Sequence, residues 1–209
     1  MLDEHDPKAK LTEGGVPCPR GGRADTPAEL ASISAALNAP LALKGLGQPH
    51  KSESGLIQLN LTEHELATAA NTMDGADGFL VEEMAPTPVG ELLVGLRRDP
   101  VYGVSLTIGT GGITAELLSD TQTLILPVDG DEVLAAISRL RLAPLLNGYR
   151  GKPKADVDAA VKAIMAMAHA IQTDRRLDEI EVNPLMVARL GEGAIAADAV
   201  IWIKNDQGD

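Results

Sequence analysis

Short apolar runs and alternating apolar and polar positions predict several β-strands along the chain. They fall at 41–44, 55–60, 79–81, 91–96, 104–108, 113–118 and 123–128. Apolar residues at helical spacing predict helices, at 28–37, 62–73, 131–142 and 157–171. Thr62 and Glu65 have the spacing of a capping box, which supports the start of the second helix. The middle of the chain is therefore expected to form a sheet with the last two helices packed on it.

A stiff segment, Ala85–Pro88, follows the predicted strand at 79–81. Its two prolines cannot continue a central strand, because proline lacks the N–H that a strand ladder requires. We therefore place the boundary between two lobes at this strand. The predicted lobes span residues 1–78 and 79–209.

The most informative pattern lies near the end of the chain. Polar and aliphatic residues alternate from Glu179 to Asn183, so a strand there places its polar side chains on one face. A turn at 190–193 then leads to an apolar run that contains a single acidic residue, Asp198, and a hairpin is the natural arrangement. With an even number of loop residues Asn183 and Asp198 share a face, whereas an odd number separates them.

Carboxylate and amide oxygens that lie side by side suit Mg²⁺, which takes one or two protein oxygens and completes its shell with water and phosphate. Asn183 and Asp198 are thus the candidate metal ligands, with Glu181 as a third or supporting group. The alternative is a set of polar residues on the solvent face of a hairpin. The apolar neighbours of Asp198 argue against that alternative.

Charge and composition narrow the possible partners. The 209 residues carry a net charge of −12 and only 2% aromatic residues, which disfavours non-specific binding to nucleic acid or to an anionic membrane. No stretch approaches the apolar length of a membrane-spanning helix. Cys18 is the only cysteine, so no internal disulfide can form. These features, with a charged N-terminus, lead us to expect a cytoplasmic protein.

A series of short motifs covers nearly the whole chain. They are Ala42-Leu43-Lys44, His50-Lys51-Ser52-Glu53, Phe79 to Met84, Gly90-Glu91-Leu92, Arg98-Asp99-Pro100, Gly109-Thr110-Gly111-Gly112 with Glu116, Gly148-Tyr149-Arg150-Gly151, Glu181 to Leu185 and Ala197-Asp198-Ala199. In this order they resemble the ATP-grasp domain of NDP-forming acyl-CoA synthetases, a group that includes ADP-forming acetyl-CoA synthetase and, more distantly, the β subunit of succinyl-CoA ligase.

The resemblance implies an ATP-grasp fold of the α+β class, with two lobes and a nucleotide bound between them. It implies ATP or ADP with Mg²⁺ as ligands, and a ligase reaction in which acid, CoA and ATP interconvert with acyl-CoA, ADP and phosphate. Phosphate would travel on a histidine. CoA-binding and CoA-ligase domains, or an α-type subunit, would be the partners, and the chain alone is expected to be inactive. A hetero- or homo-oligomer is expected.

The residue types at the motifs agree with such roles. Lys44 ends an apolar strand, where a cation can neutralise phosphate charge, and His50 lies on a polar loop, where a neutral imidazole can accept a phosphoryl group. Each could instead be an ordinary surface residue. The resemblance implies that His50 is catalytic. It implies that the nucleotide is bound by Lys44, Glu82, Glu83, Met84, Glu91, Gly111, Gly112 and Arg150.

The local chemistry leaves several of these assignments open. Backbone N–H and C=O groups at Glu82–Met84 could pair with an adenine edge, or the segment could be a charged strand end. The glycines at 109–112 could let amides approach an anion, or could serve a tight turn. Arg150 could contact phosphate or cap a helix.

Two other functions are weighed against the synthetase. One is a non-catalytic regulatory module of the same fold, associated with an acetyltransferase. The other is a carboxylate-amine ligase of the wider ATP-grasp class, against which the segment His50–Ser52 argues because such ligases need no histidine relay.

Overall fold

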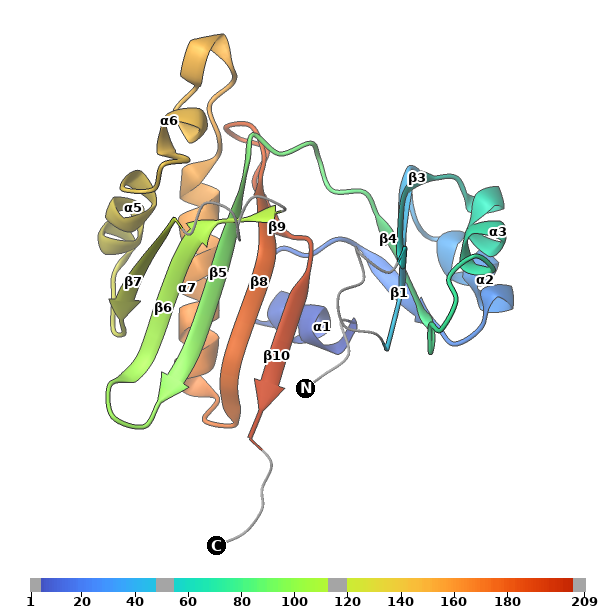
Figure 1. Cartoon of the computed structure of the whole chain (residues 1–209), viewed down its shortest axis with the longest axis horizontal. Coiled ribbons are helices and arrows are strands. Elements are labelled where there is room, and N and C mark those ends of the chain that lie inside the picture. Colours follow the sequence, from blue (N-terminus) through green and yellow to red (C-terminus); the bar gives the residue numbers. More distant parts are fainter. Residues whose placement is uncertain (1–4, 48–54, 113–119, 205–209) are drawn as a thin grey trace, which may run out of the picture. The chain divides into compact units, whose positions relative to one another are not determined.

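The computed structural model describes residues 5–47, 55–112 and 120–204, and these form two compact units (Figure 1). The smaller unit contains Pro19–Ala85, and the larger combines Asp6–Cys18 with the chain from Pro86 onward. The division differs from the one expected at residue 79 in two respects. The strand at 79–83 pairs within the smaller unit, and the N-terminal helix belongs to the larger one.

The smaller unit is a sheet with helices on one face. Its strands are β1 (Gly21–Ala24), β2 (Leu41–Gly45), β3 (Ile57–Leu61) and β4 (Phe79–Glu83), in the order β1-β4-β2-β3 and antiparallel at every pairing. Its helical segments are η1 (Pro27–Glu29), α2 (Leu30–Ser34), η2 (Glu63–Glu65) and α3 (Leu66–Ala70). The buried residues include Leu30, Leu43, Leu66 and Val81. The predicted capping box is present, because the Glu65 carboxylate accepts the Thr62 N–H at 2.8 Å.

Strand β1 is the element of this unit that apolar patterning does not predict. A Cβ on Gly21 would lie 2.4 Å from the carbonyl oxygen of Val81, and one on Gly22 would lie 2.6 Å from Ile33. Glycine is therefore required by close packing against β4 and α2, although it weakens strand propensity.

The larger unit is built on a second antiparallel sheet. Its strands are β5 (Gly90–Asp99), β6 (Gly103–Thr110), β7 (Thr121–Ile125), β8 (Leu177–Val187), β9 (Ala194–Ala196) and β10 (Ala199–Ile203), ordered β10-β8-β5-β6-β7 with β9 also paired to β8. Its helical segments are α1 (His5–Glu13), α5 (Gly130–Ser138), α6 (Ala143–Leu146), η4 (Tyr149–Gly151) and α7 (Val157–Thr173).

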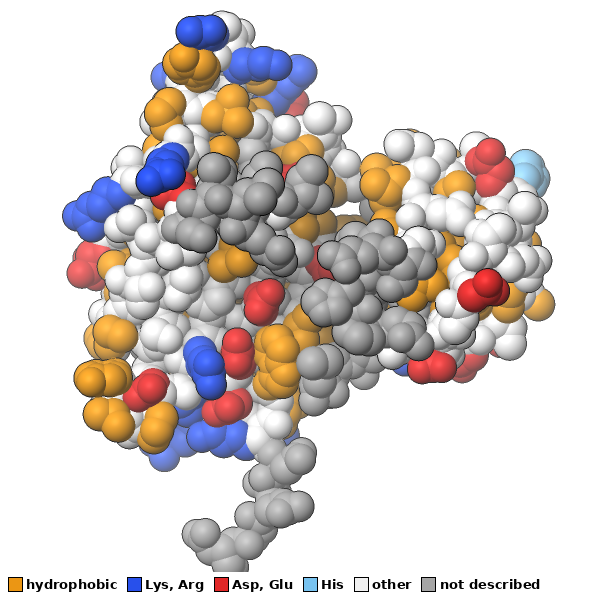
Figure 2. Space-filling model, in the orientation of Figure 1, with side chains coloured by type: hydrophobic (Ala, Val, Ile, Leu, Met, Phe, Trp, Pro, Cys, Tyr) orange, Lys and Arg blue, Asp and Glu red, His pale blue; other side chains and the backbone are white. Residues whose placement is uncertain are grey.

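Helices α5 and α7 cover one face of this sheet, as predicted for the helices at 131–142 and 157–171, and α7 runs behind the strands in Figure 1. Ile164, Met167 and Ile171 of α7 are fully buried against aliphatic residues of the strands. The opposite face carries polar and charged side chains, and Figure 2 shows Asp and Glu gathered on it. The predicted strand at 113–118 lies outside the described residues. No helix in the described ranges combines the length and apolarity needed to cross a bilayer.

Candidate functional site

The hairpin near the end of the chain brings the two predicted metal ligands together. Ala199 pairs with Val182 and Ala196 with Leu185, so β9 and β10 pair with β8 in the same register. In that register Asn183 stands directly opposite Asp198, and the Asn183 N–H donates to the Asp198 carbonyl at 3.2 Å. The loop between them contains an even number of residues, which is the alternative that places both side chains on one face.

These side chains line a small pocket with Glu181, Ala199 and Val200. Burial and the neighbouring carboxylate of Glu179 raise the pKa of Glu181. Among the described residues, no group of three or more His, Cys, Asp or Glu side chains is placed so that it could hold a metal ion. The site therefore offers a carboxylate and an amide, with one further carboxylate nearby, which fits a hard cation that keeps water and phosphate oxygens as its other ligands.

Asn183 also contacts the glycine segment that follows β6. Its Oδ1 accepts the Gly112 N–H at 3.0 Å, and the Gly111 N–H donates to the Glu91 carbonyl at 2.8 Å. Gly112 has a φ of +69°, and a Cβ there would overlap the Glu91 carboxylate. The structure thus gathers Glu91, Gly111, Gly112, Asn183 and Asp198 at one end of the larger sheet.

The glycines in this segment are needed for packing within the chain. A Cβ on Gly111 would lie 2.5 Å from the backbone of Leu92, and one on Gly109 would lie 2.8 Å from Thr121. Their immediate role is to let the backbone pack closely against β5 at Gly111 and against β7 at Gly109. The Gly112 N–H points to the Asn183 side chain, so it helps to orient a predicted metal ligand.

In the smaller unit, the two predicted residues Lys44 and Glu82 form an ion pair. They project from β2 and β4 on the face opposite the helices, and Lys44 Nζ lies 3.1 Å from Glu82 Oε2. Their side chains are only 9% and 3% exposed. Lys44 therefore carries a buried charge that Glu82 partly balances, and it is not the surface lysine that the sequence left as an alternative.

Glu83 and Met84 use their polar groups to hold the smaller unit together. The Glu83 carboxylate accepts bonds from the Asn38 backbone at 3.0 Å and the Arg20 guanidinium at 3.2 Å. The Glu83 N–H donates to the Arg20 carbonyl, and the Met84 N–H to the Pro40 carbonyl. Because these two amides already have partners, an adenine edge would meet the carbonyl groups of this segment rather than these N–H groups.

Two predicted site residues remain, His50 and Arg150. His50 lies outside the described residues. Arg150 lies in η4 with a φ of 50°, is exposed, and has its guanidinium 5.1 Å from the ring centre of Tyr149. No hydrogen bond or ion pair within the described ranges connects Arg150 to Asn183 or Asp198.

Sequence reasoning missed two residues that support the larger unit's site. Asp120 closes the base of the glycine segment, because its carboxylate accepts the Thr110 hydroxyl at 3.0 Å and its carbonyl accepts the Thr110 N–H at 3.1 Å. Lys8 of α1 donates to the Ala197 carbonyl at 2.6 Å. The threonine inside the glycine run is a signal for a partner such as Asp120, whereas no pattern in the sequence marks Lys8.

Residues 1–203 match the ATP-grasp domain family. The chain therefore belongs to the ATP-grasp family, and the predicted ATP-grasp fold of the α+β class is confirmed.

Its relatives are acyl-CoA ligases. The chain is 28% identical to subunit beta of acetate–CoA ligase [ADP-forming] II from Pyrococcus furiosus, over 96% of this chain and 91% of that one. It is 30% identical to trans-feruloyl-CoA synthase FCS1 from an unknown prokaryotic organism, over 98% of this chain but only 31% of the relative. The chain thus corresponds to about a third of the longer relative and to most of the separate subunit.

Solved structures give the same relationship. Acetyl-coenzyme A synthetase 1 of Candidatus Korarchaeum cryptofilum, in complex with coenzyme A and Ca-AMPCP, superposes with a TM-score of 0.86 at 28% identity and covers 97% of this chain and 93% of its own. Another structure of that enzyme holds Mg-AMPPCP, with its phosphohistidine segment pointing towards the nucleotide binding site.

Proposed function

We propose that this chain is the nucleotide-binding, phosphoryl-transferring subunit or domain of an NDP-forming acyl-CoA synthetase. The observation that carries the proposal is the juxtaposition of Asn183 and Asp198 on one face of the hairpin, with Gly112 bonded to the first of them. It is supported by the relatives, which are β subunits or domains of ADP-forming CoA ligases.

The residues of the larger unit fit a magnesium ion bound with the phosphates of ATP or ADP. Asn183 Oδ1 and a carboxylate oxygen of Asp198 would be the protein ligands, and Glu181 would hold water in the outer shell. Magnesium, when bound, would offset the phosphate charge that builds up during transfer. The Gly112 N–H keeps Asn183 oriented, because it fixes the amide oxygen on the pocket side.

The smaller unit would contribute a cation and a nucleotide-binding segment. Lys44 is buried beside Glu82 and would neutralise phosphate charge, while the carbonyl groups of Glu82–Met84 would receive the adenine amino group. Glu91 of the larger unit would face the ribose or phosphate side of the nucleotide. Arg150 remains a proposed phosphate contact that rests on its motif alone.

His50 is the proposed carrier of the phosphoryl group. A neutral imidazole nitrogen would attack the γ-phosphorus of ATP, a P–N bond would form as the P–O bond to ADP breaks, and the imidazole would release its second N–H proton to solvent. In the reverse direction ADP would take the group back. The partner would be an α-type subunit or domains that bind CoA and the acid, in a hetero- or homo-oligomer.

The test is transfer of label from [γ-³²P]ATP to the chain in the presence of Mg²⁺. We expect an acid-labile, base-stable phosphoramidate in the wild-type chain, and none in His50→Ala. Binding of ATP, measured by calorimetry, should change less than about threefold in His50→Ala, because the histidine contributes to chemistry and little to affinity.

His64→Ala is the matched control, since His64 lies on η2 with no proposed role. It should be labelled as fully as the wild type. Equal labelling of His50→Ala would overturn the relay. A wild-type chain that binds Mg-ATP in no measurable way would instead favour the non-catalytic module associated with an acetyltransferase.

The cytoplasm is the proposed location. Cys18 is the only cysteine of the chain, so no disulfide can form within it, which suits a reducing compartment.

A further inference from the structure

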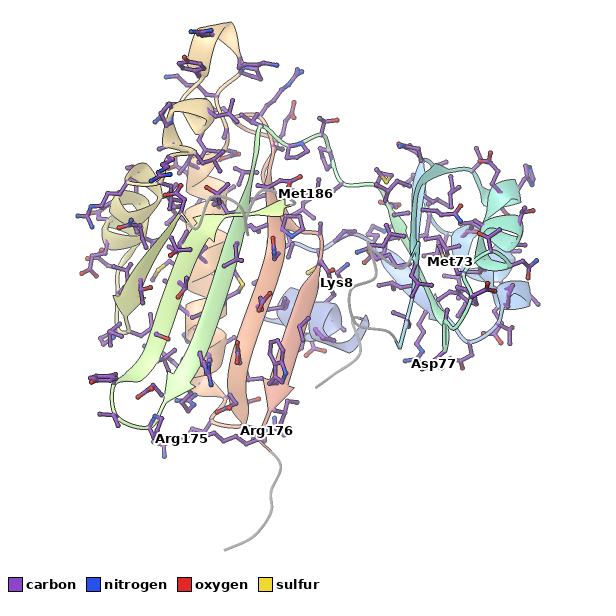
Figure 3. The ribbon with its side chains drawn as sticks, in the orientation of Figure 1. Lys8, Met73, Asp77, Arg175, Arg176 and Met186 are labelled. Carbon is purple, nitrogen blue, oxygen red and sulfur yellow. The ribbon has the colours of Figure 1, made fainter. Side chains whose placement is uncertain are left out.

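The N-terminal helix is bonded to the strand connection that carries Asp198. Residues 6–18 belong to the larger unit, with Leu11 and Val16 buried in its core. The Pro17 carbonyl accepts the Ala196 N–H at 2.8 Å, and Lys8 Nζ donates to the Ala197 carbonyl at 2.6 Å. Figure 3 shows Lys8 near the start of β10. Two hydrogen bonds from this segment therefore hold Ala196 and Ala197, the two residues just before the proposed metal ligand Asp198.

The strand ladder is incomplete at this connection because of a proline. Ala197 faces Pro184 across the hairpin, and the Ala197 N–H donates to the Pro184 carbonyl at 3.0 Å. In an antiparallel pair of this kind the facing residue returns a bond from its own N–H. Proline has no N–H, so Pro184 cannot return it. The Ala197 carbonyl must find its donor elsewhere, and Lys8 is that donor.

Lys8 is unusually placed for a lysine. Its residue is only 4% exposed, and an ammonium group is rarely buried unless polar partners compensate for lost hydration. A neutral side chain at this position of α1 could not bring a charged donor to the Ala197 carbonyl. Lys10, two residues further along α1, makes a different contact: its Nζ lies 2.9 Å from the carboxylate of Asp174, which follows α7.

We propose that Lys8 is a positioning residue for the divalent cation: it completes the ladder that Pro184 leaves open and so holds Asp198 opposite Asn183. This inference rests on the proposed function, because it assumes that these two side chains bind the metal. Partners in the outer shell of a metal site fix the direction of its ligands, and their loss typically weakens metal affinity by about 10- to 100-fold.

The experiment measures Mn²⁺ binding by electron paramagnetic resonance in the presence of saturating ADP, and ADP binding by calorimetry in EDTA. Lys8→Met should weaken Mn²⁺ binding by about tenfold and leave ADP binding in EDTA unchanged. Lys8→Arg, which keeps the charge and the N–H donors, should recover most of the Mn²⁺ affinity. Trp202, the single tryptophan, lies on β10 and reports folding by its emission.

Lys10→Met is the matched control, because it removes an equal charge from the same helix at a contact remote from Ala197. It should lower the unfolding temperature without changing Mn²⁺ affinity. Unchanged Mn²⁺ binding in Lys8→Met, tighter binding, or equal weakening in Lys8→Met and Lys10→Met would each overturn the inference. Failure of the proposed function is distinguishable: in that case the wild type binds no Mn²⁺ with ADP, or Asp198→Asn binds it as well as the wild type.

Discussion

At the scale of single residues, Gly112 decides whether the Asn183 side chain is held in place. Its φ of +69° and the overlap of any Cβ with Glu91 exclude other residues without rearrangement. We expect Gly112→Ala to lose about 1–3 kcal/mol of stability and to weaken binding of Mg-ATP by about tenfold, because the clash of the new Cβ with Glu91 would move the backbone N–H away from the Asn183 amide oxygen. Urea unfolding and calorimetry measure the two effects.

Gly95→Ala provides the control for that substitution. Gly95 lies on the same strand as Glu91, and a Cβ there would have no neighbour within 4 Å. The variant should keep wild-type affinity and equal or slightly higher stability. If Gly112→Ala were equally harmless, the bond between Gly112 and Asn183 would have no role in orienting the site.

Residue types singled out candidate side chains but not their contacts. Asp198 is the one acidic residue of an apolar run, and the structure places it in the lining of a pocket with Glu181 and Asn183, while its role as a metal ligand stays a prediction. The side chain of Glu83, by contrast, bonds to Arg20 and Asn38, residues far away in sequence. Nothing in the local pattern around Glu83 encodes those partners.

At the scale of elements, the turn between β8 and β9 is tied to the start of α7 by one carboxylate. Asp156 caps the helix through the Ala159 N–H at 3.2 Å, and its other oxygen accepts the Gly191 N–H at 2.9 Å and the Gly193 N–H at 3.1 Å. We expect Asp156→Ala to lower the free energy of unfolding by about 2 kcal/mol, because the helix loses its cap and the amides of Gly191 and Gly193 lose their acceptor. Chemical denaturation checks the value.

The control for the capping prediction is Asp158→Ala in the first turn of the same helix. Asp158 is exposed, so its removal should change stability by less than about 0.5 kcal/mol. Equal destabilisation by both substitutions would mean that general charge near the helix start, rather than the Asp156 bonds, supports the turn.

A second element-scale prediction concerns acid stability. Hydrogen bonds from Arg176 and Lys10 lower the pKa of Asp174, which follows α7. The folded-state pKa is lower than the unfolded value, so the carboxylate stabilises the fold above about pH 4 and that stability is lost as the pH falls below it. Asp174→Asn should therefore be less stable than the wild type by on the order of 1 kcal/mol at pH 7.

The difference between the two proteins should shrink as the pH falls from about 4 towards 2, because the carboxylate of Asp174 then becomes protonated in the unfolded wild-type chain, which stabilises the unfolded state. Urea unfolding at several pH values measures it. A difference that stayed constant throughout this range would show that Asp174 acts by packing and not by its charge.

Apolar patterning located most of the strands and the two long helices. It predicted β2, β5, β6, α5 and α7 within a few residues, since each buries one apolar face. It missed β1, where glycines are chosen for close packing, and α1, whose burial depends on contacts with the distant Ala196–Ala197 segment. Long-range contacts of this kind are not encoded in local periodicity.

At the scale of the whole molecule, the proposed role is divided between two units, and the smaller unit interrupts the chain of the larger one. The larger unit uses residues 6–18 from before the smaller unit begins, so a cut at residue 79 would leave the larger unit without α1. We expect a fragment 79–209 to unfold at least several degrees lower than the same unit in the full chain, because Leu11 and Val16 leave its core.

Adding a peptide of residues 1–18 in trans should raise the unfolding temperature of that fragment. Calorimetric melting follows both steps. A fragment as stable alone as with the peptide would contradict the assignment of the N-terminal helix to the larger unit.

The central claim is that Asn183 and Asp198 together hold a divalent cation with the phosphates of a nucleotide. The most direct test is a crystal structure of the chain with ADP and Mn²⁺, using anomalous scattering to find the ion. The account predicts a peak bonded to Asn183 Oδ1 and an Asp198 carboxylate oxygen, at about 2.0–2.2 Å, and to phosphate oxygen. A bound nucleotide whose cation touches neither side chain would contradict it.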